Sequence, residues 1–163
     1  MSSYEWASLI VSILGFLVAA YAAYSSSNAK AKSEEANKSA EASVEISLRS
    51  AITSANEKMM DCHESMEDLL AKRSLTADEK RLMELKQNRF NVALENYLNA
   101  YEEACSMYLD NKVDKVRFQK NYVSEIRNLV EKKELSKYFD AVTSRYKAML
   151  KVYREWNDLE NNH

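Results

Sequence analysis

The sequence predicts an all-α protein with an N-terminal transmembrane helix that continues into a long helix, plus a cytoplasmic helical bundle. Three observations favour this class. Proline is absent and glycine occurs once in 163 residues, as expected for long helices with few tight turns. Residues 7–24 form an uncharged, mostly apolar run. Beyond residue 44, apolar residues recur in steps of three and four, which is the helical period.

The uncharged run at residues 7–24 predicts a transmembrane anchor, which we place at residues 1–25. As a helix its 18 residues span about 27 Å, close to the roughly 30 Å hydrocarbon core of a bilayer. Lysine and arginine follow the run but do not precede it, so the N-terminus is expected outside and the C-terminal domain in the cytoplasm. A cleaved signal peptide is the alternative, because Ala20 and Ala22 imitate a cleavage site. The absence of a basic residue before the run argues against it.

A seam of small residues runs through residues 8–54 in steps of four and three. This 3.5-residue period is that of coiled coils, and small residues let parallel helices approach closely. The seam consists of Ser8, Ser12, Gly15, Ala19, Ala22, Ser26, Ala29, Ser33, Ala36, Ala40, Ser43, Ser47, Ser50 and Ser54. Its first six members are the expected pore-lining or helix-packing residues. Residues 26–43 are expected to continue the helix as a stalk, with a flexible Ser- and Ala-rich linker as the alternative.

Residues 44–163 are expected to form a cytoplasmic four-helix domain. The first helix gains a large apolar face from Val44 and ends near Arg73. Thr76 and Glu79 form a capping box that begins a second helix at residues 77–109. Asp114 caps a third helix at residues 115–132, and apolar spacing predicts a fourth at residues 135–159.

The same spacing predicts which side chains of these helices face inward. They are Val44, Leu48, Ala51, Ile52, Ala55, Met59, Cys62, Met66, Leu69 and Leu70 on the first helix; Leu82, Leu85, Phe90, Leu94, Tyr97, Tyr101, Cys105 and Tyr108 on the second; Val116, Tyr122, Val123, Ile126 and Val130 on the third; and Phe139, Val142, Tyr146, Met149, Tyr153 and Trp156 on the fourth.

No motif of catalytic chemistry occurs in the sequence. We find no nucleophile–base set, glycine-rich phosphate loop or paired metal motif, and expect no enzyme activity, metal or cofactor. Cys62 and Cys105 lie on apolar helical faces, as small buried thiols do. Cys62 and His63 are adjacent, so their side chains point to different helix faces and do not chelate one metal.

A basic edge on the third helix is the sharpest candidate binding site. Arg117, Lys120, Ser124 and Arg127 fall within about 80° of arc, beside the buried stripe. In a symmetric oligomer this edge would repeat around the axis as a basic ring for an anionic ligand, which Lys112, Lys115 and Arg145 would extend. The alternative is ion pairing of these side chains with Glu125, Glu131 or Asp140. The net charge of -2 excludes a general polyanion binder but not such a local patch.

The layout resembles a family of bacterial proteins, the membrane effectors of the Hailong antiphage defence system, which act with a nucleotidyltransferase. The resemblance lies in the apolar span, the small-residue extension and the helices around residues 93–118, ALENYLNAYEEACSMYLDNKVDKVRF. It implies an oligomeric ion channel of the bacterial inner membrane. A single-stranded oligonucleotide bound to the cytoplasmic domain would keep this channel closed. Infection would remove the ligand and open the pore.

These observations predict a homo-oligomeric pore-forming effector, with a tetramer as the working number of subunits. Parallel helices with small residues toward the axis either pack tightly or, after a modest rotation, line a narrow pore that serine hydroxyls wet. The alternative is a membrane-tethered helical scaffold that recruits a cytosolic protein and forms no pore.

Overall fold

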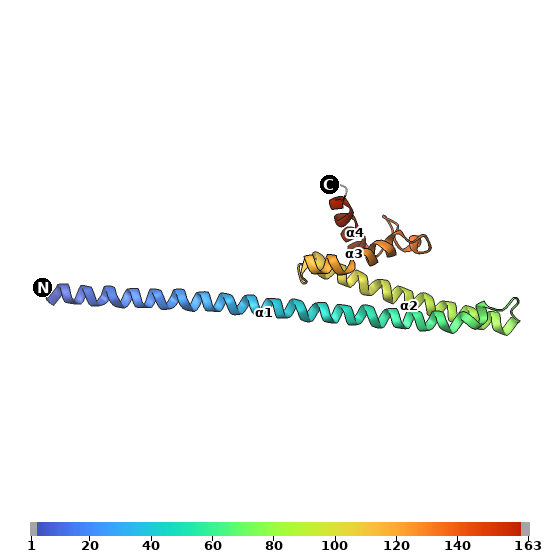
Figure 1. Cartoon of the computed structure of the whole chain (residues 1–163), viewed down its shortest axis with the longest axis horizontal. Coiled ribbons are helices and arrows are strands. Elements are labelled where there is room, and N and C mark those ends of the chain that lie inside the picture. Colours follow the sequence, from blue (N-terminus) through green and yellow to red (C-terminus); the bar gives the residue numbers. More distant parts are fainter. Residues whose placement is uncertain (1–2, 161–163) are drawn as a thin grey trace. The chain divides into compact units, whose positions relative to one another are not determined.

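The computed structural model describes the backbone of residues 3–160 and the side chains of residues 15, 16 and 19–157. Within the described residues the chain is helical and has no strand (Figure 1), which confirms the all-α prediction. The elements are α1 (Ser3–Leu70), α2 (Ala77–Leu109), α3 (Lys115–Glu131), the 3₁₀ helix η1 (Lys133–Tyr138) and α4 (Lys147–Glu160). The chain divides into two compact units, residues 1–40 and 41–163.

The described residues of the first unit all belong to α1. Residues 26–43 are helical throughout, so a flexible linker, the alternative for this stretch, is wrong. When only the residues with described side chains are considered, no helix is both long enough and apolar enough to cross a membrane. Most of the predicted span at residues 7–24 lies outside those side chains, which include only 15, 16 and 19–24 of it. The transmembrane helix therefore stays a prediction.

The predicted caps begin α2 and α3. The Thr76 hydroxyl accepts a hydrogen bond from the Glu79 amide at 3.3 Å, and the Glu79 carboxylate accepts one from the Thr76 amide at 2.9 Å. Lys72 lies 2.5 Å from the same carboxylate; this contact and the Thr76 bonds lower the Glu79 pKa to about 2. Asp114 accepts from the Arg117 amide at 3.0 Å. The predicted capping box and N-cap are confirmed.

The predicted fourth helix is wrong in its first half. Residues 133–138 form η1, and α4 begins only at Lys147. Between them, the Asp140 carboxylate accepts hydrogen bonds from the Val142 and Thr143 amides at 3.0 and 2.8 Å. The Ser144 hydroxyl bridges the Tyr138 carbonyl and the Tyr146 amide. Aspartate, serine and threonine side chains that bond nearby backbone compete with helix formation, and here they hold a turn.

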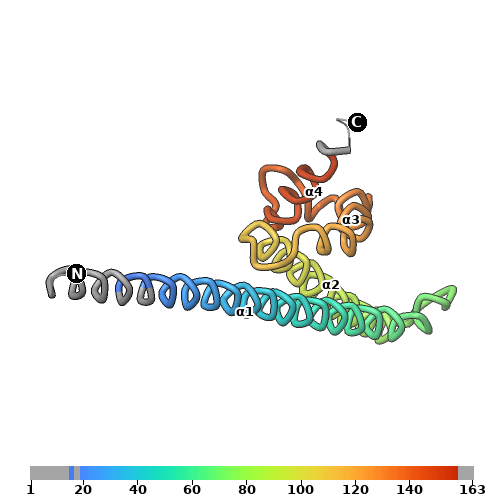
Figure 2. The backbone as a smooth tube through the Cα atoms, turned by 60° about the vertical axis from the view of Figure 1, so that its left-hand side comes forward, coloured from blue at the N-terminus to red at the C-terminus, as the bar shows by residue number. Residues whose placement is uncertain are grey.

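The hydrophobic core of the second unit surrounds the C-terminal half of α2, where α3 and α4 lie close to it (Figure 2). Trp156 donates a hydrogen bond to the Tyr108 hydroxyl at 3.1 Å, and their rings meet edge to face with centroids 5.5 Å apart. Phe118 contacts both rings, with its ring centroid 5.4 Å from that of Tyr108 and 6.3 Å from that of Trp156. Buried residues of α1, including Leu48 and Ile52, complete this cluster.

The helical period alone misassigned several inward positions. Leu82, Leu85 and Val116 are exposed, and Val142 is 85 % exposed because it lies in the Asp140 turn. Ala51 and Leu70 on α1 were also predicted to face inward but are exposed. Conversely, Phe118 is fully buried although the prediction omitted it. Val116 precedes Phe118 by two residues, or about 200° of helix, so burial of Phe118 turns Val116 to solvent.

The start of α4 is held by a residue of α2. The Glu102 carboxylate accepts hydrogen bonds from the amides of Ala148 at 2.8 Å and Met149 at 2.9 Å. The first amides of a helix have no partner within it, and a negative charge near them is also favourable for the helix dipole. Glu102 therefore caps α4 and fixes its position on α2.

We predict that Glu102→Ala destabilises the second unit, because two amides at the start of α4 lose a charged acceptor. The free energy of unfolding should fall by roughly 1–3 kcal/mol. Urea unfolding followed by tryptophan fluorescence would measure this, since Trp156 lies on α4. Glu103→Ala is the matched control, because Glu103 is the next residue of the same helix and is exposed. Equal stabilities of the two variants would show that Glu102 does not act as a cap.

Candidate functional site

Arg117 of the predicted basic edge is already paired inside the chain. The Arg117 guanidinium donates from Nε and Nη2 to the two carboxylate oxygens of Glu45, at 2.6 and 2.7 Å. This contact raises the pKa of Arg117 above its ordinary value. The partner lies on α1 and is none of the three acids expected as alternatives. Such bidentate pairs combine charge with fixed geometry.

The acids expected as alternatives have other hydrogen-bond donors. Glu125 accepts from the Tyr101 hydroxyl at 2.7 Å, and Glu131 accepts from the Tyr153 hydroxyl at 2.8 Å. Asp140 holds its own turn. No local pattern points to Glu45, because 72 residues separate it from Arg117.

The other members of the basic edge differ in their surroundings. Lys120 and Ser124 are exposed, whereas Arg127 is half-buried and donates to the Asn157 side chain at 3.3 Å. Lys115 lies over the Tyr108 ring, with its ammonium 4.8 Å from the ring centre. Lys112 and Arg145 are exposed. Arg117 is exposed as well, but Glu45 holds its guanidinium.

The N-terminal seam is exposed wherever it is described. Gly15, Ala19, Ala22 and Ser26 are exposed, and so are the later members of the seam up to Ser54. The side chains of Ser8 and Ser12 lie outside the described residues. A Cβ atom built at Gly15 meets no atom within 4 Å.

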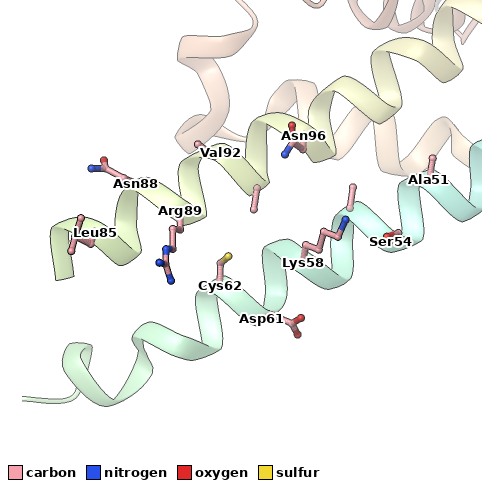
Figure 3. Close-up of a pocket in the computed structure, with 12 residues that line it drawn as sticks. Ala51, Ser54, Lys58, Asp61, Cys62, Leu85, Asn88, Arg89, Val92 and Asn96 are labelled. Carbon is pink, nitrogen blue, oxygen red and sulfur yellow. The ribbon is translucent and has the colours of Figure 1, made fainter. Parts of the chain in front are cut away.

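An open groove of about 910 Å³ lies between residues 51–62 of α1 and 85–96 of α2. Ala51, Ala55 and Ala93 line it, and such short side chains leave space between two helices that larger ones would fill. Figure 3 shows Cys62 and Arg89 reaching into this space, whereas Asp61 points away from it. Lys58 and Arg89 are the basic residues of its lining.

The described part of the second unit contains two free cysteines, Cys62 and Cys105. Burial, and secondarily the nearby Glu102 charge, raise the pKa of the Cys105 thiol, which opposes formation of the nucleophilic thiolate. Cys62 is half-buried in the groove wall. In the part of the chain that the structure describes, no group of three histidine, cysteine, aspartate or glutamate side chains is placed to hold a metal ion.

No protein-family model, no curated protein and no solved structure matches this chain.

We predict that Glu45→Ala loosens the start of α3. Glu45 holds Arg117 and also accepts a hydrogen bond from the amide of Asp114 at 3.0 Å. Hydrogen exchange at residues 114–118 should become roughly two- to tenfold faster. Glu57→Ala is the control, because Glu57 lies on the same helix and is exposed. Unchanged exchange in Glu45→Ala would mean that the pair does not order α3.

Proposed function

We propose that this chain is a homo-oligomeric membrane pore-forming effector in bacterial antiphage defence, gated through its cytoplasmic domain. One observation supports it above others. Every described side chain between residues 15 and 40 is exposed, including Phe16 at 74 %, Tyr21 at 73 % and Tyr24 at 71 %. Large aromatic side chains that stay exposed in a single chain indicate a surface that lipid or another protein covers.

The sequence pattern assigns lipid and other copies to different faces of this helix. The uncharged run at residues 7–24 suits the hydrocarbon core of the bacterial inner membrane. The seam that includes Ser8, Ser12, Gly15, Ala19, Ala22 and Ser26 suits close contact between parallel copies, with a tetramer as the working number. A small rotation of the helices would turn the hydroxyls of Ser8 and Ser12 toward a water-filled axis.

Gating would act through the basic edge of α3. Lys120 and Ser124 are exposed, and Arg117 can exchange the Glu45 carboxylate for a phosphate, since both are oxygen acceptors that suit its guanidinium fork. The proposed ligand is a single-stranded oligonucleotide made by a nucleotidyltransferase, bound by Arg117, Lys120, Ser124 and Arg127. Loss of this ligand on infection would open the pore.

The test compares the wild-type chain with Gly15→Leu in bacterial cells, using a potential-sensitive dye and growth. We expect wild-type expression to depolarise the membrane, and Gly15→Leu to abolish this while the protein still reaches the membrane. Because a Cβ atom at Gly15 meets no atom within 4 Å in the single chain, we expect the loss to report contact between copies or the pore lumen. Phe16→Leu is the control, since Phe16 lies off the seam.

The same cells are assayed with and without phage, because a chain held closed by its ligand depolarises the membrane only after infection. A normal potential in both conditions, with wild-type oligomers intact in the membrane, would rule out the pore. Recovery of the wild-type chain in the soluble fraction would rule out the anchor.

The groove between α1 and α2 favours a second candidate, a membrane-tethered scaffold without a pore. Its lining combines alanines with exposed Leu85 and Val92 and with two basic side chains, Lys58 and Arg89. An apolar floor with basic groups suits an amphipathic helix that carries acidic residues, presented by a cytosolic protein.

A charge reversal separates the two candidates. If the chain is a scaffold, Arg89→Glu should abolish any growth phenotype of expression, because it repels an acidic partner helix, and Gly15→Leu should leave that phenotype intact. Arg81→Glu is the control, since Arg81 is exposed on α2 and does not line the groove. A phenotype that survives Arg89→Glu but is lost in Gly15→Leu would exclude the scaffold.

A further inference from the structure

A second, smaller hollow lies where α1, α2 and α3 meet in the second unit. It measures about 340 Å³, near the lower limit of roughly 300–1,000 Å³ for small-molecule sites. Unlike the α1–α2 groove, most of its lining side chains are polar or aromatic. They are Arg49, Ile52, Thr53 and Asn56 of α1, Tyr97 and Tyr101 of α2, and Asn121, Tyr122 and Glu125 of α3.

Three tyrosines form an aromatic corner of this pocket, in which the partly exposed Tyr97 and Tyr122 flank the buried Tyr101. Tyr101 lies between two rings that are nearly perpendicular to it: the Tyr97 centroid is 5.1 Å away at 84°, and the Tyr122 centroid is 6.3 Å away at 86°. The electron-rich faces of such rings attract cations, and several rings around one site suit a methylated ammonium group.

A carboxylate lies beside the aromatic corner. The buried Tyr101 hydroxyl donates to one oxygen of Glu125 at 2.7 Å and can accept from the Tyr97 hydroxyl at 3.4 Å. Burial, reinforced by Tyr97 and Glu125, raises the pKa of Tyr101, so its hydroxyl keeps its proton and continues to donate. The second oxygen of Glu125 has no hydrogen-bond partner among the described residues. This negative charge favours a cation in the same corner.

The α1 wall of the pocket carries the opposite charge. Arg49 lines the pocket and makes no ion pair or hydrogen bond with the described residues. A simple cation would be repelled by this guanidinium, and a simple anion by Glu125. A molecule that carries both charges satisfies both walls, with a carboxylate on the Arg49 fork and the ammonium against the tyrosines.

We propose that this pocket binds a small zwitterion of the betaine class, that is, a methylated ammonium group joined by a short linker to a carboxylate. The side-chain amides of Asn56 and Asn121 supply further donors for the carboxylate. The proposal goes beyond the pore and does not depend on it, because the pocket lies wholly within residues 49–125.

Calorimetric titration of the purified full-length chain tests this, with glycine betaine as the probe. Choline and acetate are titrated in parallel, because each presents one half of the zwitterion. We expect glycine betaine to bind at least about tenfold more tightly than either half, since both charged walls contribute. No heat with glycine betaine, or choline binding as tightly as glycine betaine, would overturn the proposal.

Matched variants show whether the binding occurs in this pocket. Arg49→Met, Glu125→Gln and Tyr122→Leu should each weaken binding of glycine betaine about tenfold or more. Arg73→Met and Glu103→Gln remove the same charges from exposed positions outside the pocket and should leave binding unchanged. Circular dichroism confirms that each variant is folded. Folded pocket variants that bind as tightly as the wild type would overturn the assignment.

Discussion

The hydrogen bonds from the start of α4 to Glu102 are the contact on which the second unit depends. Glu102 supplies acceptors to two backbone amides that a helix start otherwise leaves unpaired. With its first turn held on α2, α4 places Met149, Val152 and Trp156 in the core. Tyr108 then accepts from Trp156 and donates to Glu155, so α4 is tied to α2 near both ends.

This arrangement gathers the large side chains around the C-terminal half of α2, whereas the part of the α1–α2 hairpin nearer its turn, residues 51–62 and 85–96, encloses a groove. Short residues such as Ala55 and Ala93 face the space between the two helices there, and an open groove remains. Closer to the core, polar side chains converge from α1, α2 and α3 into the smaller pocket. The two hollows differ chemically because the helices contribute alanines in one place and tyrosines, Arg49 and Glu125 in the other.

The basic edge shows which features of a binding site the helical period of a sequence can predict. Period alone predicts that Arg117 and Lys120 lie near one another beside the buried stripe, because that relation lies within one helix. It gives no information on Glu45, which reaches Arg117 from α1. The tyrosine pocket was missed for the same reason, since its three walls come from three helices. Its tyrosines were predicted as core residues, and Tyr101 is indeed buried.

The sequence by itself determined the all-α class, the starts of α2 and α3, and the break at the end of α2. The signals are local: Thr76 and Glu79 cap α2, Asp114 caps α3, and Asn111 adopts the left-handed conformation that ends a helix (φ 56°). The Asp140 turn carried a comparable local signal in Asp140, Thr143 and Ser144, but the apolar period of the neighbouring residues obscured it.

Only the tertiary structure decided which apolar residues are buried and which charges are paired. Phe118 rather than Val116 enters the core, and Glu45 rather than a nearby acid holds Arg117. A helical period fixes angles around one axis, whereas burial and pairing depend on which face of that axis another helix covers. Contacts between residues far apart in the chain, such as that between Glu102 and Ala148, decide which face of a helix is covered.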